Sequence, residues 1–112
     1  MLKMIIRMDD KKINIEKKYR LDGIYKTIDN IFFKMGLPRM EEASNSLVYR
    51  DNGRTTDYGR FGKIVNTLKR QPWFMENVVE WLFCDSDDSD SPDEFNEEDL
   101  LNHYRQKQAM RA

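Results

Sequence analysis

The sequence has one cysteine, one histidine, three prolines and no long apolar run. A single cysteine, Cys84, excludes an intramolecular disulfide and favours a reducing compartment. No apolar stretch approaches the roughly 20 residues of a membrane-spanning helix, and the N-terminus lacks the features of a signal peptide. We therefore expect a cytoplasmic protein with no membrane partner, folded as one small domain over residues 1–112.

Groups suited to catalysis are also scarce. Cys84 is followed closely by carboxylates, which raise the pKa of a thiol and oppose its use as a nucleophile. One Cys and one His, His103, do not supply a conventional zinc site. The segment 57–62 has two glycines before a helix but lacks the Lys-Ser/Thr ending of a phosphate-binding loop. The sequence therefore predicts no catalytic residue, no metal site and no cofactor.

Charge is distributed unevenly along the chain. Residues 1–80 carry 16 basic and 11 acidic residues, a net charge of +5, whereas residues 81–112 carry 3 basic and 9 acidic residues, a net charge of −6. The net charge of −1 for the whole chain conceals this asymmetry. The pI of about 5.9 argues against a protein dedicated to nucleic-acid binding.

All nine acidic residues of segment 81–112 lie between Asp85 and Asp99, with no basic residue among them. Such a run must be solvated, complement a helix N-terminus or be neutralised by a partner. A calcium loop of the EF-hand type does not fit, because Asp90 replaces the required glycine and Asn96 the bidentate glutamate. Weak cation binding by the clustered carboxylates, and a carboxylate-dependent metal enzyme, stay open as distant alternatives.

We predict that an acidic loop over residues 84–92 binds a basic surface on a protein partner. Closely spaced carboxylates have a charge density similar to that of a nucleic-acid backbone and attract positively charged grooves. The candidate partner-binding residues are Asp85, Asp87, Asp88 and Asp90. The chain is then a small non-enzymatic interaction or regulatory protein, and its composition is typical of an accessory protein from a bacterial or mobile-element genome.

The alternative function is nucleic-acid binding by basic residues on and before a helix at 58–70. The candidate phosphate-binding residues are Arg54, Arg60, Lys63 and Arg70, of which the last three share one helical face. An ordinary solvated helix face explains the same pattern.

Hydrophobic periodicity predicts four helices. A helix at 20–35 has seven apolar residues on one face and ends at Gly36, which suits a left-handed residue. A second helix, at 58–70, has Asp57 as its cap and ends before Pro72. An apolar third helix is predicted at 72–83 and a last helix at 93–112, whose start is enriched in acidic residues.

The first 19 residues alternate in hydrophobicity around a polar tetrad, which predicts a β-hairpin of segments 2–8 and 13–19. This hairpin is either part of the core or an extension, and residues 47–49 are a candidate third strand. The expected fold class is therefore α+β and mostly helical, with the hairpin packed on a four-helix arrangement.

Overall fold

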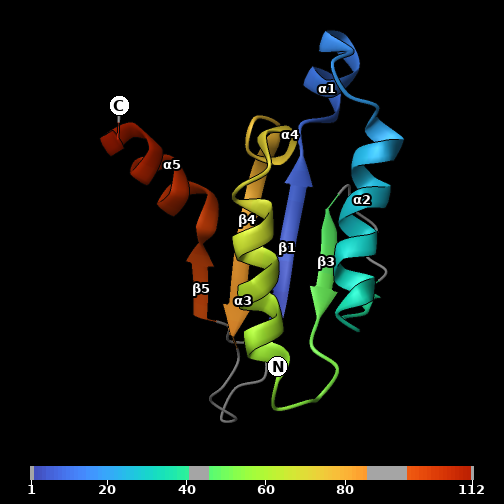
Figure 1. The fold of residues 1–112 in the computed structure, drawn as a ribbon, viewed down its shortest axis with the longest axis vertical. Helices are drawn as coiled ribbons and strands as arrows, with labels where there is room; N and C mark the ends of the chain where they lie inside the picture. The colour runs from blue at the N-terminus through green and yellow to red at the C-terminus, as the bar shows by residue number, and fades with distance from the viewer. Residues whose placement is uncertain (1, 41–45, 86–95, 112) are drawn as a thin grey trace.

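The computed structural model describes residues 2–40, 46–85 and 96–111. Figure 1 shows helices on the viewer's side of a twisted sheet. The elements, in chain order, are β1 Leu2–Met8, α1 Asp10–Glu16, α2 Leu21–Lys34, β2 Arg39–Met40, β3 Leu47–Arg50, α3 Asp57–Leu68, α4 Pro72–Met75, β4 Val78–Asp85, β5 Asn96–Asp99 and α5 Leu100–Arg111.

A five-stranded antiparallel sheet in the order β2-β3-β1-β4-β5 organises the fold. The class is α+β, but the prediction of a mostly helical, four-helix arrangement is wrong, because the helices pack on this sheet rather than on one another. β1 is the central strand and pairs with β3 on one side and β4 on the other. The N-terminal segment is therefore part of the core.

The predicted N-terminal hairpin is wrong in its second half. Residues 2–8 form a strand as expected, but Asp10–Glu16 is the helix α1, with the carboxylate of Asp9 accepting a hydrogen bond from the backbone N–H of Lys12. Ile13 is buried whereas Ile15 is 73% exposed. Two residues apart on a strand would share one face, but on a helix they point in nearly opposite directions. The short alternation did not distinguish these two cases.

The helices α2 and α3 confirm the predictions for 20–35 and 58–70, and both cover the same face of the sheet (Figure 1). Phe32 of α2 stacks on Tyr49 of β3 with ring centroids 3.7 Å apart, and Phe61 of α3 packs 5.3 Å from Phe83 of β4. The predicted strand at 47–49 is confirmed as β3, although it pairs with β1 and β2 rather than extending a hairpin. Gly36 has the expected positive φ, 70°.

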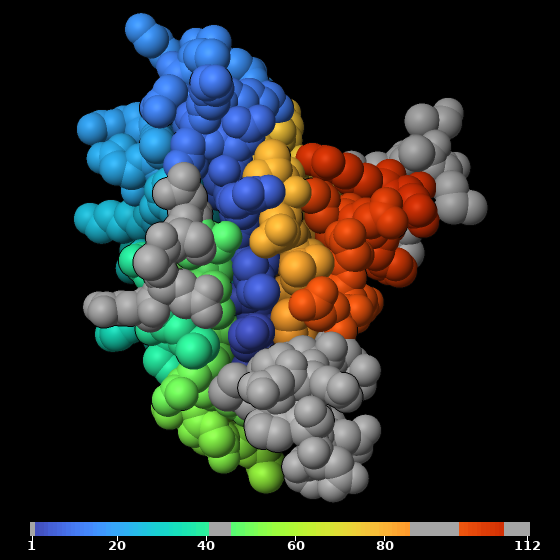
Figure 2. Space-filling model, turned by 180° about the vertical axis from the view of Figure 1, so that it is seen from behind, coloured from blue at the N-terminus to red at the C-terminus, as the bar shows by residue number. Residues whose placement is uncertain are grey.

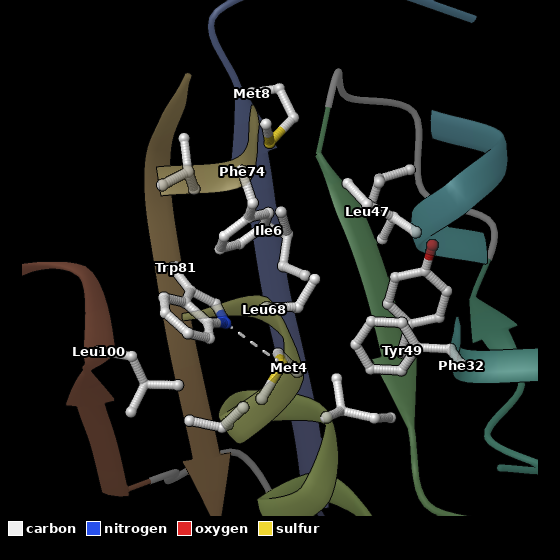
Figure 3. Packing of buried hydrophobic residues seen from close by; sticks show 14 of the residues in the cluster. Met4, Ile6, Met8, Phe32, Leu47, Tyr49, Leu68, Phe74, Trp81 and Leu100 are labelled. Carbon is white, nitrogen blue, oxygen red and sulfur yellow. Dashed lines mark hydrogen bonds between the residues drawn. The ribbon is translucent and has the colours of Figure 1, made fainter. Parts of the chain in front are cut away.

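The core lies between this sheet face and the helices (Figure 3). Trp81, on β4, is fully buried; its indole N–H donates to the sulfur of Met4 over 3.4 Å, and Phe74 packs edge-on at 4.9 Å. Leu68 closes the same cluster from α3. Burial of large side chains of this kind supplies most of the stability of a small domain.

The predicted helix at 72–83 is wrong. Only Pro72–Met75 is helical, as α4, and Val78–Asp85 is the strand β4. A continuous apolar run suits both a buried helix and a buried strand, and the aromatic and β-branched residues Val78, Val79, Trp81 and Phe83 favour the strand. A bulge opposite Arg7 and Met8 accommodates the extra residue where β4 begins.

The predicted last helix at 93–112 begins later than expected. Asn96–Asp99 is the edge strand β5, and the helix α5 begins at Leu100. The backbone N–H of Asn102 donates to Asp99 Oδ1 at 3.0 Å, so Asp99 caps this helix. None of the helices among the described residues combines the length and hydrophobicity needed to span a bilayer.

Candidate interaction surface

The two residues that flank segment 86–95 of the acidic run lie next to each other at one end of the sheet. Asp85, the last residue of β4, is in register with Asn96, the first residue of β5. The run therefore joins two paired strands rather than two helices. Asp87, Asp88 and Asp90 lie outside the described residues, whereas Asp85 is half-buried on β4.

β5 adds three exposed carboxylates to this end of the sheet: Glu97, Glu98 and Asp99. Because side chains alternate along a strand, Glu97 and Glu98 project from opposite faces of the sheet edge. Asp99 has a structural role as the cap of α5. We call Asp85, Glu97, Glu98 and Asp99 the acidic end; the sequence prediction had assigned the last three to a helix start.

Charged residues of both signs lie at the other end of β1. The strand runs from Leu2, opposite Asp85, to Met8, and α1 follows directly with Lys11 and Lys12 and then the basic segment 17–20. Figure 1 shows α1 at the end of the molecule opposite the N-terminus. The seven residues of β1 separate the two ends by roughly 20 Å. Lys12 pairs there with Glu16, and Lys18 with Glu76, so the described residues at this end form no basic patch to match the acidic end.

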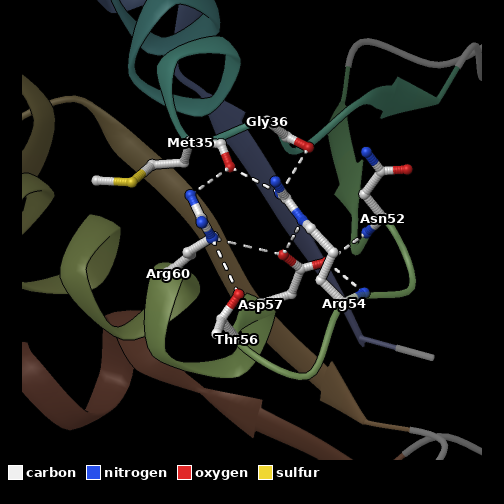
Figure 4. A network of polar contacts seen from close by, with 7 residues as sticks. All are labelled: Met35, Gly36, Asn52, Arg54, Thr56, Asp57 and Arg60. Carbon is white, nitrogen blue, oxygen red and sulfur yellow. Dashed lines mark hydrogen bonds and ion pairs between the residues drawn. The ribbon is translucent and has the colours of Figure 1, made fainter.

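The arginines of the alternative phosphate site belong to a network around one buried carboxylate (Figure 4). Asp57 is fully buried at the start of α3, and its Oδ2 accepts the backbone N–H groups of Asn52 at 2.6 Å and Arg54 at 3.3 Å. Its Oδ1 accepts the Arg54 side-chain Nε–H at 2.9 Å. We call these contacts and those of Arg60 the Asp57 network.

The same network holds the end of α2. Arg54 Nη2 donates to the carbonyl oxygens of Met35 at 2.9 Å and Gly36 at 3.1 Å, and Arg60 Nη1 donates to that of Met35 at 3.3 Å. Arg60 Nε also lies 3.8 Å from Asp57 Oδ1. Two guanidinium groups thus complement the negative end of the α2 dipole. A phosphate group would have to compete with these contacts.

The electrostatics of Asp57 follow from these donors. Burial by itself would raise the pKa of the carboxyl group, but the hydrogen bonds from Asn52 and Arg54 and the charge of Arg54 outweigh it, so the pKa lies below its ordinary value. The sequence indicated Asp57 only as a helix cap. Its contacts through Arg54 to α2 join segments some 20 residues apart, which no local pattern reveals.

The other two candidate phosphate-binding residues are exposed: Lys63 lies on α3, and Arg70 lies two residues beyond its end. The four basic residues therefore divide into two that stabilise the packing of α2 on α3 and two that face solvent. They do not form one continuous site.

No arrangement for catalysis is apparent among the described residues. Cys84 is completely buried, and burial together with the nearby charge of Glu97 raises the pKa of its thiol. His103 is exposed on α5. The described part of the chain contains no group of three or more His, Cys, Asp or Glu side chains able to hold a metal ion.

A hollow of about 420 Å³ lies between α2 and the β2–β3 edge of the sheet. In it, Asp29 accepts hydrogen bonds from the hydroxyl of Tyr49 and, at 3.0 Å, from Arg39. Burial and the hydrogen bond to Asp29 raise the pKa of Tyr49. All three polar groups are satisfied by one another, which is the pattern of a structural contact between helix and sheet.

Comparison with known proteins identifies no relative of this chain. No protein-family model matches the chain, and neither the curated proteins nor the solved structures include a detectable relative.

Proposed function

We propose that the protein is a small non-enzymatic binding protein whose acidic end binds a basic surface on another macromolecule. The observation that carries the proposal is the register of Asp85 with Asn96, which brings the two residues flanking segment 86–95 of the acidic run to one end of the sheet. Glu97 and Glu98 follow Asn96 directly and are exposed on the edge strand β5.

The concentration of carboxylates at the acidic end supports this choice. Clustered carboxylates attract a basic surface at long range and steer its approach toward the acidic end. The high density of carboxylates suits a groove that normally holds a nucleic-acid backbone. The partner class is accordingly a protein with a positively charged groove, and the action is competition for that groove.

Nucleic-acid binding by this chain is less well supported. Of the four basic residues considered for it, Arg54 and Arg60 already donate to Asp57 and to the carbonyl groups at the end of α2. Lys63 and Arg70 alone offer too few phosphate contacts for binding at moderate salt.

The test is affinity capture from extracts of the source cell. The wild type is compared with Glu97→Gln/Glu98→Gln and with a variant in which Asp85, Asp87, Asp88 and Asp90 are replaced by Asn. The matched control is Glu16→Gln/Asp22→Asn, which removes the same number of exposed charges as the first variant from the opposite half of the chain.

We expect the wild type and the control to capture the same basic protein and both acidic-end variants to lose it. Loss must occur while each variant keeps the circular dichroism spectrum of the wild type. Capture that is equal for all four proteins contradicts the proposal.

A further inference from the structure

Within residues 2–40, 46–85 and 96–111, no helix lies over the two central strands on the face of the sheet turned away from α2 and α3. Figure 2 shows β1 and β4 side by side at the middle of this face, with α5 to one side of them. Met4 and Ile6 point to the buried face, so Ile5 and Arg7 point to this one. We call the side chains of Ile5, Arg7, Glu80 and Leu82 the outer sheet face.

Its four residues form two cross-strand pairs. Ile5 is in register with Leu82 and Arg7 with Glu80. The apolar pair is only half-buried, although it sits on the two central strands of the sheet. Beside it, the basic side chain is on β1 and the acidic one on β4. One cross-strand pair of this face is therefore apolar, and the other carries one positive and one negative charge.

This arrangement is complementary to itself. Consider a two-fold axis that runs parallel to the strands, between β1 and β4 and above the face. It places β1 of one copy over β4 of the other, so that Arg7 faces the second copy's Glu80 and Ile5 faces its Leu82. The contact between Arg7 of one copy and Glu80 of the other then occurs twice in the dimer. A two-fold axis perpendicular to the strands and parallel to the sheet would instead place β1 over β1. Arg7 and Glu80 of the two copies would then no longer face each other.

We propose that the outer sheet face is a homodimer interface in which two copies pack face to face about this axis. Sheets packed in this way lie about 10 Å apart with their strands within about 30° of each other. The contact removes the half-buried Ile5 and Leu82 from water in both copies. Since the axis is parallel to the strands, both acidic ends lie at the same end of the dimer.

The proposal is tested by sedimentation equilibrium over micromolar to millimolar protein concentrations. The variants are Arg7→Glu and Glu80→Arg, each of which places like charges opposite one another across the interface. We expect either change to weaken the dimer by roughly 100-fold or more in Kd. The control Lys63→Glu reverses a charge on α3, on the other side of the sheet, and should dimerise as the wild type does.

Two combinations separate an interface from a general loss of stability. An equimolar mixture of Arg7→Glu and Glu80→Arg should form a heterodimer, because every contact again joins opposite charges. The double variant Arg7→Glu/Glu80→Arg should form a homodimer for the same reason. A wild type that stays monomeric throughout the concentration range overturns the proposal. So does a dimer that survives both single changes, or a mixture that fails to associate.

Discussion

The Asp57 network makes a demanding prediction about stability, because one carboxylate there serves two backbone N–H groups and an arginine. Replacing Asp57 by Ala removes the acceptor for the N–H groups of Asn52 and Arg54 and for Arg54 Nε. It also leaves Arg54 and Arg60 without their counter-charge. The change should loosen the junction between the end of α2 and the start of α3.

The size of the loss follows from the burial of the partners. Removing one member of a fully buried ion pair costs about 3–5 kcal/mol. The side chains of Arg54 and Arg60 are 38% and 36% exposed, so water compensates part of this cost. Each buried N–H left without an acceptor costs about 1–3 kcal/mol. We expect Asp57→Ala to lower the free energy of unfolding by about 3 kcal/mol, and Tm by about 10–15 °C.

The assay is urea and thermal unfolding followed by circular dichroism. Asp22→Ala is the control, because Asp22 is exposed and its polar contacts within the described part of the chain are with Arg20 and its own neighbour Gly23. It should change stability by less than about 0.5 kcal/mol. A double-mutant cycle between Asp57→Ala and Arg54→Ala should give a coupling free energy above about 1 kcal/mol. A loss below about 1 kcal/mol for Asp57→Ala, or strict additivity in the cycle, would refute this account of the network.

Three further predictions follow from the described contacts. The pKa of Asp57 is lowered in the folded state, so its contribution to stability is present above the unfolded pKa near 4 and is lost as pH falls through the folded pKa. The free energies of unfolding of wild type and Asp57→Ala should therefore converge below about pH 4. A difference that stays constant with pH contradicts this. Iodoacetamide should modify Cys84 roughly 100-fold more slowly in the native protein than in urea, because the thiol is buried and its pKa is raised; equal rates contradict its placement. Gly36→Ala should lower the free energy of unfolding by about 1–2 kcal/mol, since φ is 70° and the new Cβ would lie 2.8 Å from Arg54 Nη2. Gly62→Ala, in open space on α3, should raise it by about 0.5–1 kcal/mol. A change of the same sign for both variants would contradict this geometry.

The sequence predicted the elements whose side chains repeat with one clear period. The helix α2 has a long apolar stripe and a glycine at its end, and both features match the structure. β4 was mistaken for a helix because a continuous apolar run has no period, and only its partners β1 and β5 decide its conformation. Secondary structure that depends on distant strands is not encoded in a local window.

The candidate site shows the same limit. The acidic run is visible in the sequence, but the pairing that brings Asp85 and Asn96 together depends on β5, whose residues Asn96–Asp99 have no strand-like composition. Conversely, the sequence groups Arg54 and Arg60 with Lys63 as candidate phosphate-binding residues. Their contacts to Met35 and Gly36 arise only after α2 and α3 pack side by side.

The central claim is that the acidic end binds a basic surface by electrostatic attraction. Its most direct test is the association rate constant of the captured partner with the wild type and with Glu97→Gln/Glu98→Gln, measured at low and at moderate salt. We predict that the double change slows association about tenfold at low salt and that the difference shrinks as salt screens the charges. Equal rate constants for the two proteins at low salt would contradict the claim.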